Sequence, residues 1–218
     1  QCRNPDHLKA LVQACRQRGV LISEHLAAHA FNLRGNQIES VATSAGELKA
    51  GSYCITSGAW TGQLLKQLSV PNGILPVRGQ MILYRCPERL LQHIVNEGTR
   101  YLVPRNDGRL LVGSCEEEVG FDKSTTAEML TELTTLAESL VPQLQSATVE
   151  RSWAGLRPGS FDGFPYLGPI PGLEHAFVAA GHFRSGLHLS TGTAVTIGQL
   201  IRGLEPAINL DAFRVGRG

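Results

Sequence analysis

Two arginines stand in segments whose other residues are mostly glycine, proline, aromatic and small side chains. Arg157 lies in the segment Trp153–Gly168, and Arg184 lies in the segment Ala179–Gly186. A guanidinium group presents parallel N–H donors that match the two oxygens of a carboxylate. The pattern therefore favours a carboxylate-bearing ligand. The alternative is that the two arginines pair with Asp162 or Glu150 and only hold loops in place, since structural ion pairs are common.

The segment around Arg184 has a second property that suits a negatively charged ligand. Gly181 to Gly186 lies between a predicted short strand and the last predicted helix. Backbone N–H groups at the start of a helix attract negative charge. The alternative is an ordinary strand-to-helix turn in which glycine allows tight packing.

Hydrophobic periodicity, caps and turn residues predict the elements that position these segments. One helix starts at Asn4-Pro5, with Asn4 as its cap, and ends at Gly19; another carries Leu64, Leu65 and Leu68. A capping box of Thr125 and Glu128 starts a third helix that ends near Val141, and the last helix covers about 191–203. Strands are predicted at 20–31, 37–43, 52–57, 77–84, 101–105, 109–114, 148–153 and 177–180.

The order of these elements predicts a mixed α/β and α+β chain. The first ~70 and the last ~60 residues have the strand and helix texture of an α/β layer, whereas the middle is richer in antiparallel hairpins. We therefore expect a substrate-binding domain with an antiparallel sheet at 73–155. It would be inserted between two pieces, 1–72 and 156–218, of a nucleotide-binding domain.

Composition argues against several classes of protein. The 218 residues carry a formal net charge of +1, and Lys and Arg form no run longer than two residues, so no nucleic-acid surface is expected. No apolar stretch approaches the ~18 residues of a membrane span. The five cysteines and seven histidines are scattered without ligand spacing, which predicts no metal site and favours a reducing cytoplasm.

A resemblance covers most of the chain, from about Asn4 to Gly203. Trp-Ala-Gly-Leu-Arg-Pro at 153–158 and Gly-His-Phe-Arg-Ser-Gly at 181–186 are similar to motifs of glycine oxidases and related bacterial members of the D-amino-acid oxidase family. The segments at 56–61, 76–80 and 101–105 look like further landmarks of that family. The resemblance implies part of a Rossmann-like FAD-binding domain with an inserted substrate domain, of the FAD-linked reductase carboxy-terminal type.

The resemblance also assigns roles to individual residues. It implies that Arg157 binds the substrate carboxylate, that Tyr101 lies near the substrate and that Arg184 lies close to substrate and flavin. Glu116 falls where a neutral pocket residue is expected, so its carboxylate either favours a cationic substrate or points away. No catalytic acid or base is implied. The implied cofactor contacts are Ala28, for the nucleotide half of FAD, and His182, Phe183, Arg184, Ser185, Gly186, Leu187 and His188, for the isoalloxazine edge.

The activity implied is oxidation of a small amino acid or secondary amine, with hydride passing from the α-carbon to non-covalent FAD. The imine would then hydrolyse, and oxygen would reoxidise the flavin to give hydrogen peroxide. A D-amino-acid or sarcosine-type oxidase, or a dehydrogenase, is the alternative enzyme. The sequence has no Gly-x-Gly-x-x-Gly loop. We therefore expect a carboxy-terminal fragment that is inactive alone, or a binding domain only, and whose unpaired strand edge favours a homo-oligomer.

Overall fold

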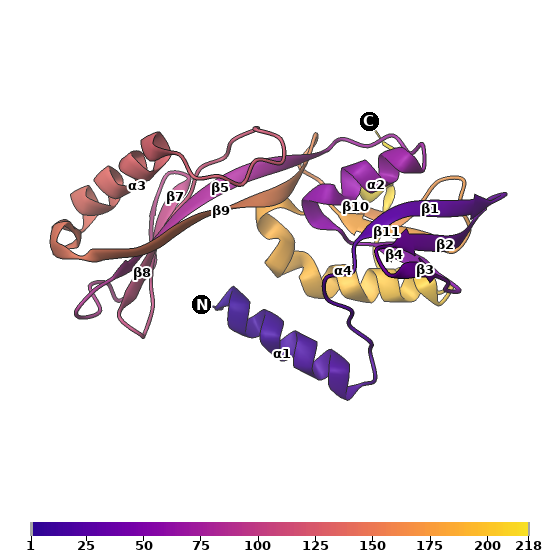
Figure 1. Cartoon of the computed structure of the whole chain (residues 1–218), viewed down its shortest axis with the longest axis horizontal. Helices are drawn as coiled ribbons and strands as arrows, with labels where there is room; N and C mark the ends of the chain where they lie inside the picture. Colours follow the sequence, from indigo (N-terminus) through magenta and orange to yellow (C-terminus); the bar gives the residue numbers. More distant parts are fainter. Residues whose placement is uncertain (1, 218) are drawn as a thin grey trace. The chain divides into compact units, whose positions relative to one another are not determined.

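The computed structural model describes residues 2–217 and divides the chain into two compact units, with the boundary between Ala50 and Gly51 (Figure 1). Each unit has its own secondary structure. The described residues include no helix that is long and apolar enough to cross a membrane. The mixed α/β class with an antiparallel sheet is the one that the sequence predicts.

The amino-terminal unit contains one helix and one antiparallel sheet of order β1-β2-β3. Its elements are α1 (Asn4–Gln17), β1 (Ala28–Arg34), β2 (Gln37–Thr43) and β3 (Gly46–Leu48). Two sequence predictions are wrong here. The N-cap of α1 is Arg3 and has no side-chain cap bond, so Asn4 does not cap the helix. The strand predicted at 20–31 begins only at Ala28, because a turn with His25 at φ 59° interrupts the extended backbone.

The carboxy-terminal unit contains a three-stranded sheet of order β10-β11-β4, in which β11 is antiparallel to β10 and parallel to β4. Its strands are β4 (Tyr53–Ile55), β10 (Tyr166–Pro169) and β11 (Ala176–Ala180). The helix α4 (Gly186–Ile201) packs on this sheet through Ile197, which contacts Leu167 and Phe177. Short helices are η1 (Gly58–Trp60), α2 (Thr61–Gln67), η3 (Phe183–Ser185) and η4 (Asp211–Phe213).

The same unit contains a five-stranded antiparallel sheet of order β6-β7-β8-β5-β9. Its strands are β5 (Ile74–Arg85), β6 (Val95–Glu97), β7 (Arg100–Pro104), β8 (Arg109–Gly113) and β9 (Thr148–Ser160). The predicted hairpin around 106–108 is present as β7 and β8. The predicted strand at 148–153 extends to Ser160, because β9 stays paired with β5 as far as Ile74. One continuous strand therefore crosses the domain boundary predicted at 155–156, and the proposed domain division stays a prediction.

One face of this sheet forms the main core against α3 (Ala127–Leu140) and η2 (Pro142–Ser146). Figure 1 shows α3 beside the end of β5 and β9 that lies away from α4. The helix is capped by Thr126, whose side chain accepts from Met129 N, so the predicted capping box of Thr125 and Glu128 is one residue out of place. The buried residues of this core include Ile82, Tyr84, Leu102, Val112, Leu133 and Ala137. We call this the α3 face of the sheet.

Candidate active site

The opposite face of the five-stranded sheet carries the predicted substrate residues, and we call it the Arg157 face. Tyr101, Gly113, Met81 and Trp153 are paired in a row across β7, β8, β5 and β9. Directly paired residues point to the same face, as do residues two apart in a strand. Arg157 therefore shares the face of Trp153, four residues earlier in β9. The sheet thus brings Arg157 and Tyr101 to one surface.

Neutral oxygen atoms hold the guanidinium group of Arg157. Its Nη1 donates to the Cys115 carbonyl oxygen at 3.1 Å, and its Nη2 donates to Ser114 Oγ in a short hydrogen bond. Among the described residues, no carboxylate forms an ion pair with Arg157. A guanidinium group has five N–H donors, so the two bonds leave three for a ligand.

Gly79 provides the surface against which this guanidinium lies. A Cβ atom added at Gly79 would lie 2.3 Å from Nη1, 2.4 Å from Nη2 and 2.5 Å from Cζ of Arg157. Only a residue without a side chain allows so close an approach. Gly155 is paired with Gly79 on β9, and a Cβ added there would meet nothing within 4 Å. The guanidinium of Arg157 therefore covers the backbone at Gly79, whereas the backbone at Gly155 is left uncovered.

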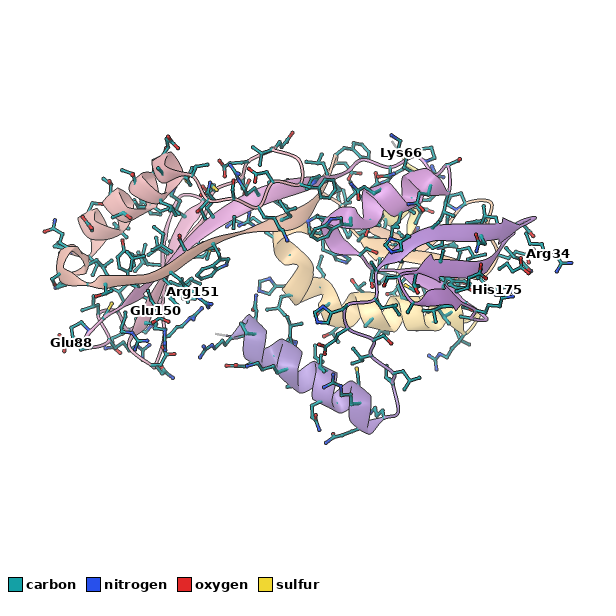
Figure 2. The ribbon with its side chains drawn as sticks, in the orientation of Figure 1. Arg34, Lys66, Glu88, Glu150, Arg151 and His175 are labelled. Carbon is teal, nitrogen blue, oxygen red and sulfur yellow. The ribbon has the colours of Figure 1, made fainter. Side chains whose placement is uncertain are left out.

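The loop-pinning alternative for Arg157 does not describe the structure, because both candidate carboxylates have other partners. Asp162 binds Arg217, with Oδ2 2.8 Å from Nε, and the hydrogen bond from Arg217 lowers the pKa of that carboxyl group. Glu150, labelled on β9 beside Arg151 in Figure 2, binds Arg109 at 2.8 Å and Arg85 at 2.9 Å. Arg157 is therefore a cation without a carboxylate partner among residues 2–217.

Arg184 has a different environment. It lies in η3, and its Nη1 is 2.7 Å from Glu116 Oε1, while its Nη2 donates to the Thr99 carbonyl oxygen at 3.4 Å. The two charged side chains are 38% and 39% exposed. Glu116 is therefore directed at Arg184, and its charge is balanced by that residue. An exposed pair of this kind contributes only ~0–1 kcal/mol, so it can open at low cost.

Tyr101 is held against the hairpin on the same face. Its hydroxyl donates to Met81 Sδ at 3.6 Å, and its ring lies close to Gly113, where an added Cβ would be 3.3 Å from Cε2. The side chain is half-buried. The hydroxyl bond to sulfur is weak, since a thioether is a poor acceptor. Tyr101 is thus positioned by packing, and its hydroxyl can turn to a better acceptor.

The predicted flavin-edge segment, 182–188, forms η3 and the first turn of α4. The helix begins at Gly186, five residues before the predicted start, and its N-cap Ser185 makes no side-chain cap bond. The first amide groups of a helix lack intrahelical partners and favour negative charge. His182 Nε2 lies 2.9 Å from Thr193 Oγ1, and burial lowers the pKa of His182, which favours the neutral ring. An uncapped helix start of this kind can bind an anionic group of a ligand.

The remaining predicted residues are placed as follows. Phe183 has φ 47°, a left-handed conformation that makes the turn into η3, and Leu187 and His188 are exposed in the first turn of α4. Ala28 is the exposed first residue of β1 in the amino-terminal unit. Its predicted contact with FAD, like the other predicted site roles, stays a prediction.

Sequence reasoning did not find Gly79, Ser114 or Cys115. Gly79 lies within the family-like segment at 76–80, but nothing in the sequence indicates that Arg157 packs on it or which residues bind its neighbour Arg78. Ser114 and Cys115 are separated from Arg157 by 43 and 42 positions. No local pattern could have connected them.

Comparison with known proteins gives a consistent result. A family model described as FAD dependent oxidoreductase matches residues 1–200. Over 208 residues the chain is 41% identical to the glycine oxidase of Pseudomonas putida, covering 95% of this chain and 57% of that protein. It is 34% identical to the hydrogen cyanide synthase subunit HcnC of Pseudomonas protegens, covering 95% of this chain and 50% of that protein.

Solved structures agree with the sequence comparisons. The crystal structure of glycine oxidase from Geobacillus kaustophilus superposes with a TM-score of 0.92 at 32% identity, covering 98% of this chain and 58% of that one. The chain thus spans a little over half the length of the glycine oxidases that it matches. Because the family model covers nearly all of the sequence and the fold agrees, the chain belongs to the FAD dependent oxidoreductase family.

Proposed function

We propose that the full-length protein oxidises a small amino acid or secondary amine with the aid of FAD, as a glycine oxidase does. The observation that carries this proposal is the state of Arg157. Its guanidinium lies against Gly79, donates to two neutral oxygens and has no carboxylate partner among the described residues. A cation fixed in this way suits the carboxylate of a substrate.

In this proposal the protein contributes orientation. Arg157 binds the two carboxylate oxygens through N–H groups that Ser114 and Cys115 do not use. Gly79 lets the guanidinium lie against the backbone of β5, and the Tyr101 hydroxyl on the same face offers a hydrogen bond. Bound FAD supplies the redox chemistry by accepting the hydride that leaves the α-carbon. Fixing the carboxylate converts a random encounter into an oriented one.

The residues for FAD are proposed on the geometry of the helix start. The amides of Gly186, Leu187 and His188, with Phe183, Arg184 and Ser185 of η3 and with His182, would face the flavin edge, and Ala28 would contact the nucleotide half. The sequence has no glycine-rich loop for the pyrophosphate. We therefore propose that the 218-residue chain folds but does not hold FAD tightly, because few contacts remain to offset the ~4–15 kcal/mol entropic cost of association.

Two experiments test these proposals. Full-length protein is assayed for hydrogen peroxide and 2-oxo acid with glycine, sarcosine and several D-amino acids. Turnover of at least one of them is expected, and the absence of turnover by a yellow, FAD-loaded protein would refute the proposed activity. FAD is titrated separately into the 218-residue chain. Sub-micromolar binding with a normal flavin spectrum would show that this chain suffices for retention.

The choice among glycine, sarcosine and D-amino acids depends on pocket size, and the assay decides it. If the 218-residue chain binds small carboxylates but not FAD, it acts as a binding domain alone. A homo-oligomer and a cytoplasmic location stay predictions of the sequence.

A further inference from the structure

We propose that the buried Arg78 is a positioning residue for Arg157, acting from the opposite face of the sheet through residues 114–117, which we call the anchor segment. This inference rests on the proposed function, since it concerns how the substrate-binding arginine is held. Arg78 itself does not touch the site. Val77 is the residue of β5 paired with Arg157, so the next residue, Arg78, points to the α3 face.

The anchor segment follows β8 and runs beside β5, with its residues alternating between the two faces. The main chains of Arg78 and Glu117 exchange two hydrogen bonds, of 2.8 and 3.1 Å. Ser114 Oγ holds Arg157, and Glu116 holds Arg184. Cys115 Sγ instead donates to Glu117 Oε2 at 2.9 Å on the α3 face, where Arg78 and Gln80 also lie.

Side chains on the α3 face hold this segment through several hydrogen bonds. Arg78 is 3% exposed and binds Glu117 at two points, Nε to Oε2 at 3.0 Å and Nη2 to Oε1 at 3.1 Å. Its Nη1 binds Asp122 and the Ser124 carbonyl oxygen. Gln80, fully buried, donates to Glu117 Oε2 at 3.0 Å and accepts from the backbone of Thr126, the cap of α3. The segment is thereby fastened to both β5 and α3.

The Arg157 face, in contrast, depends on that segment. The guanidinium of Arg157 donates to Ser114 and Cys115, and the carboxylate bound to Arg184 belongs to Glu116. A shift of the segment therefore moves both arginines of the site. The ion pair also stays charged at neutral pH, because the hydrogen bonds from Arg78 hold the pKa of Glu117 at about 2.

The test replaces the partner on the segment and leaves the guanidinium in place. In full-length protein, Glu117→Gln removes the charge that Arg78 grips. We expect kcat/KM for the carboxylate substrate to fall about tenfold or more, since a displacement near 1 Å can cost ~10²-fold. Binding of glycolate, a small carboxylate probe, should weaken in parallel by calorimetry. Asp122→Asn is the matched control, because it removes a carboxylate from the same guanidinium at a residue outside the anchor segment.

A double-mutant cycle decides whether the effect passes through Arg157. In an Arg157→Lys background, Glu117→Gln should change glycolate binding and kcat/KM less than twofold, because interacting residues are not additive. An equal loss in both backgrounds, or unchanged glycolate binding in the single variant, would overturn the inference. If Glu117→Gln does not fold, the cycle is run with Arg78→Lys, which keeps the buried charge but loses the two-point contact with Glu117.

The readouts separate this inference from the proposed function. If the wild-type protein binds glycolate but oxidises no amine, the proposed activity fails, and the cycle is still scored on glycolate binding. If the wild type is active and the cycle is additive, the activity stands and the inference fails. If wild-type protein binds no small carboxylate, both fail, because Arg157 is then no carboxylate anchor.

Discussion

Two arginines on the two faces of one sheet have opposite surroundings. On the α3 face, Arg78 is buried and bonded to the carboxylates of Glu117 and Asp122. On the other face, Arg157 is half-buried and bonded only to a hydroxyl and a carbonyl oxygen. Burying an unpaired charge is costly, and a carboxylate partner removes that cost. An arginine that is paired with carboxylates within the fold contributes to stability, whereas an arginine bonded only to neutral oxygens can still pair with an anionic ligand.

Arg157→Lys should show the largest difference between the two faces. An ammonium group cannot reproduce a two-point contact with a carboxylate, and a tilted substrate loses its alignment. We expect a loss of about 2–4 kcal/mol in kcat/KM, with KM raised and kcat lowered, when full-length protein is assayed at steady state. Its thermal unfolding should change little. Unchanged kinetics would remove Arg157 from the role of anchor and end the contrast with Arg78.

The α3 face predicts an acid-sensitive stability. The pKa of Glu117 is lowered from its ordinary value of 4.5 to about 2, chiefly by hydrogen bonds from Arg78. A carboxyl group with a lowered pKa stabilises the fold above its ordinary pKa, and this stabilisation is lost as pH falls toward 2. Because Glu117 is partly exposed, solvent screening limits its contribution to the free energy of unfolding to roughly 1–3 kcal/mol.

The measurement is the free energy of unfolding by urea between pH 6 and pH 2, for wild type and Glu117→Gln. The difference between the two proteins should shrink as the pH falls through this window. A difference that is constant with pH would mean that the ion pair with Arg78 is not what stabilises the carboxylate.

Gly79→Ala sharpens the comparison because it disturbs only the Arg157 face. The new methyl group would overlap the guanidinium, the far end of a flexible side chain, so Arg157 should move while the fold persists. We expect about a tenfold loss in kcat/KM and weaker carboxylate binding. Gly155→Ala is the control, since its methyl group meets no described atom within 4 Å. Equal losses in the two variants would indicate simple crowding of the face.

Glu116→Gln should give the smallest effect. The pair with Arg184 is more than a third exposed, so its loss should cost less than ~1 kcal/mol of stability. Arg184 would then carry an unbalanced charge beside the site. We expect the preference for a dianionic amine such as iminodiacetate over glycine to rise about two- to fivefold at low salt, and less at high salt. Identical preferences in the two proteins would place the pair outside the pocket.

Much of the fold could be predicted from the sequence where local signals were strong. The turn at 106–108 gave the β7–β8 hairpin, and the leucine stripe gave α3. The sequence did not reveal that β9 continues past Trp153, because glycine and proline at 155, 158 and 159 argue against a strand. Pairing with β5 overrides that local preference. The start of α4 was predicted too late, because Gly186 lies in its first turn and glycine has a low helix propensity.

The sequence supported a hypothesis about the chemistry of the candidate site but not about its construction. The setting of Arg157 among small and aromatic residues favoured a carboxylate ligand, with an ion pair to Asp162 or Glu150 as the alternative. The role of Arg157 as the anchor stays a prediction from the family resemblance. Its supports, Gly79 and Ser114, come from other strands, and their roles depend on register. The partner of the Glu116 carboxylate could not be predicted either, because Arg184 is 68 positions away in the sequence.

The alternation of side chains in the anchor segment has a consequence for how this family can vary in length. Inserting or deleting one residue between Ser114 and Glu117 would reverse the alternation beyond that point, so the two side chains would face the same side of the sheet and one of them would lose its partner. Natural or engineered length changes should therefore be excluded from these four positions. Residues 118–121, which connect the anchor segment to Asp122, are exposed and can accommodate such length changes instead. Mutant libraries meant to reshape the pocket would retain more folded members if they varied residues 118–121 and kept the length of the anchor segment fixed.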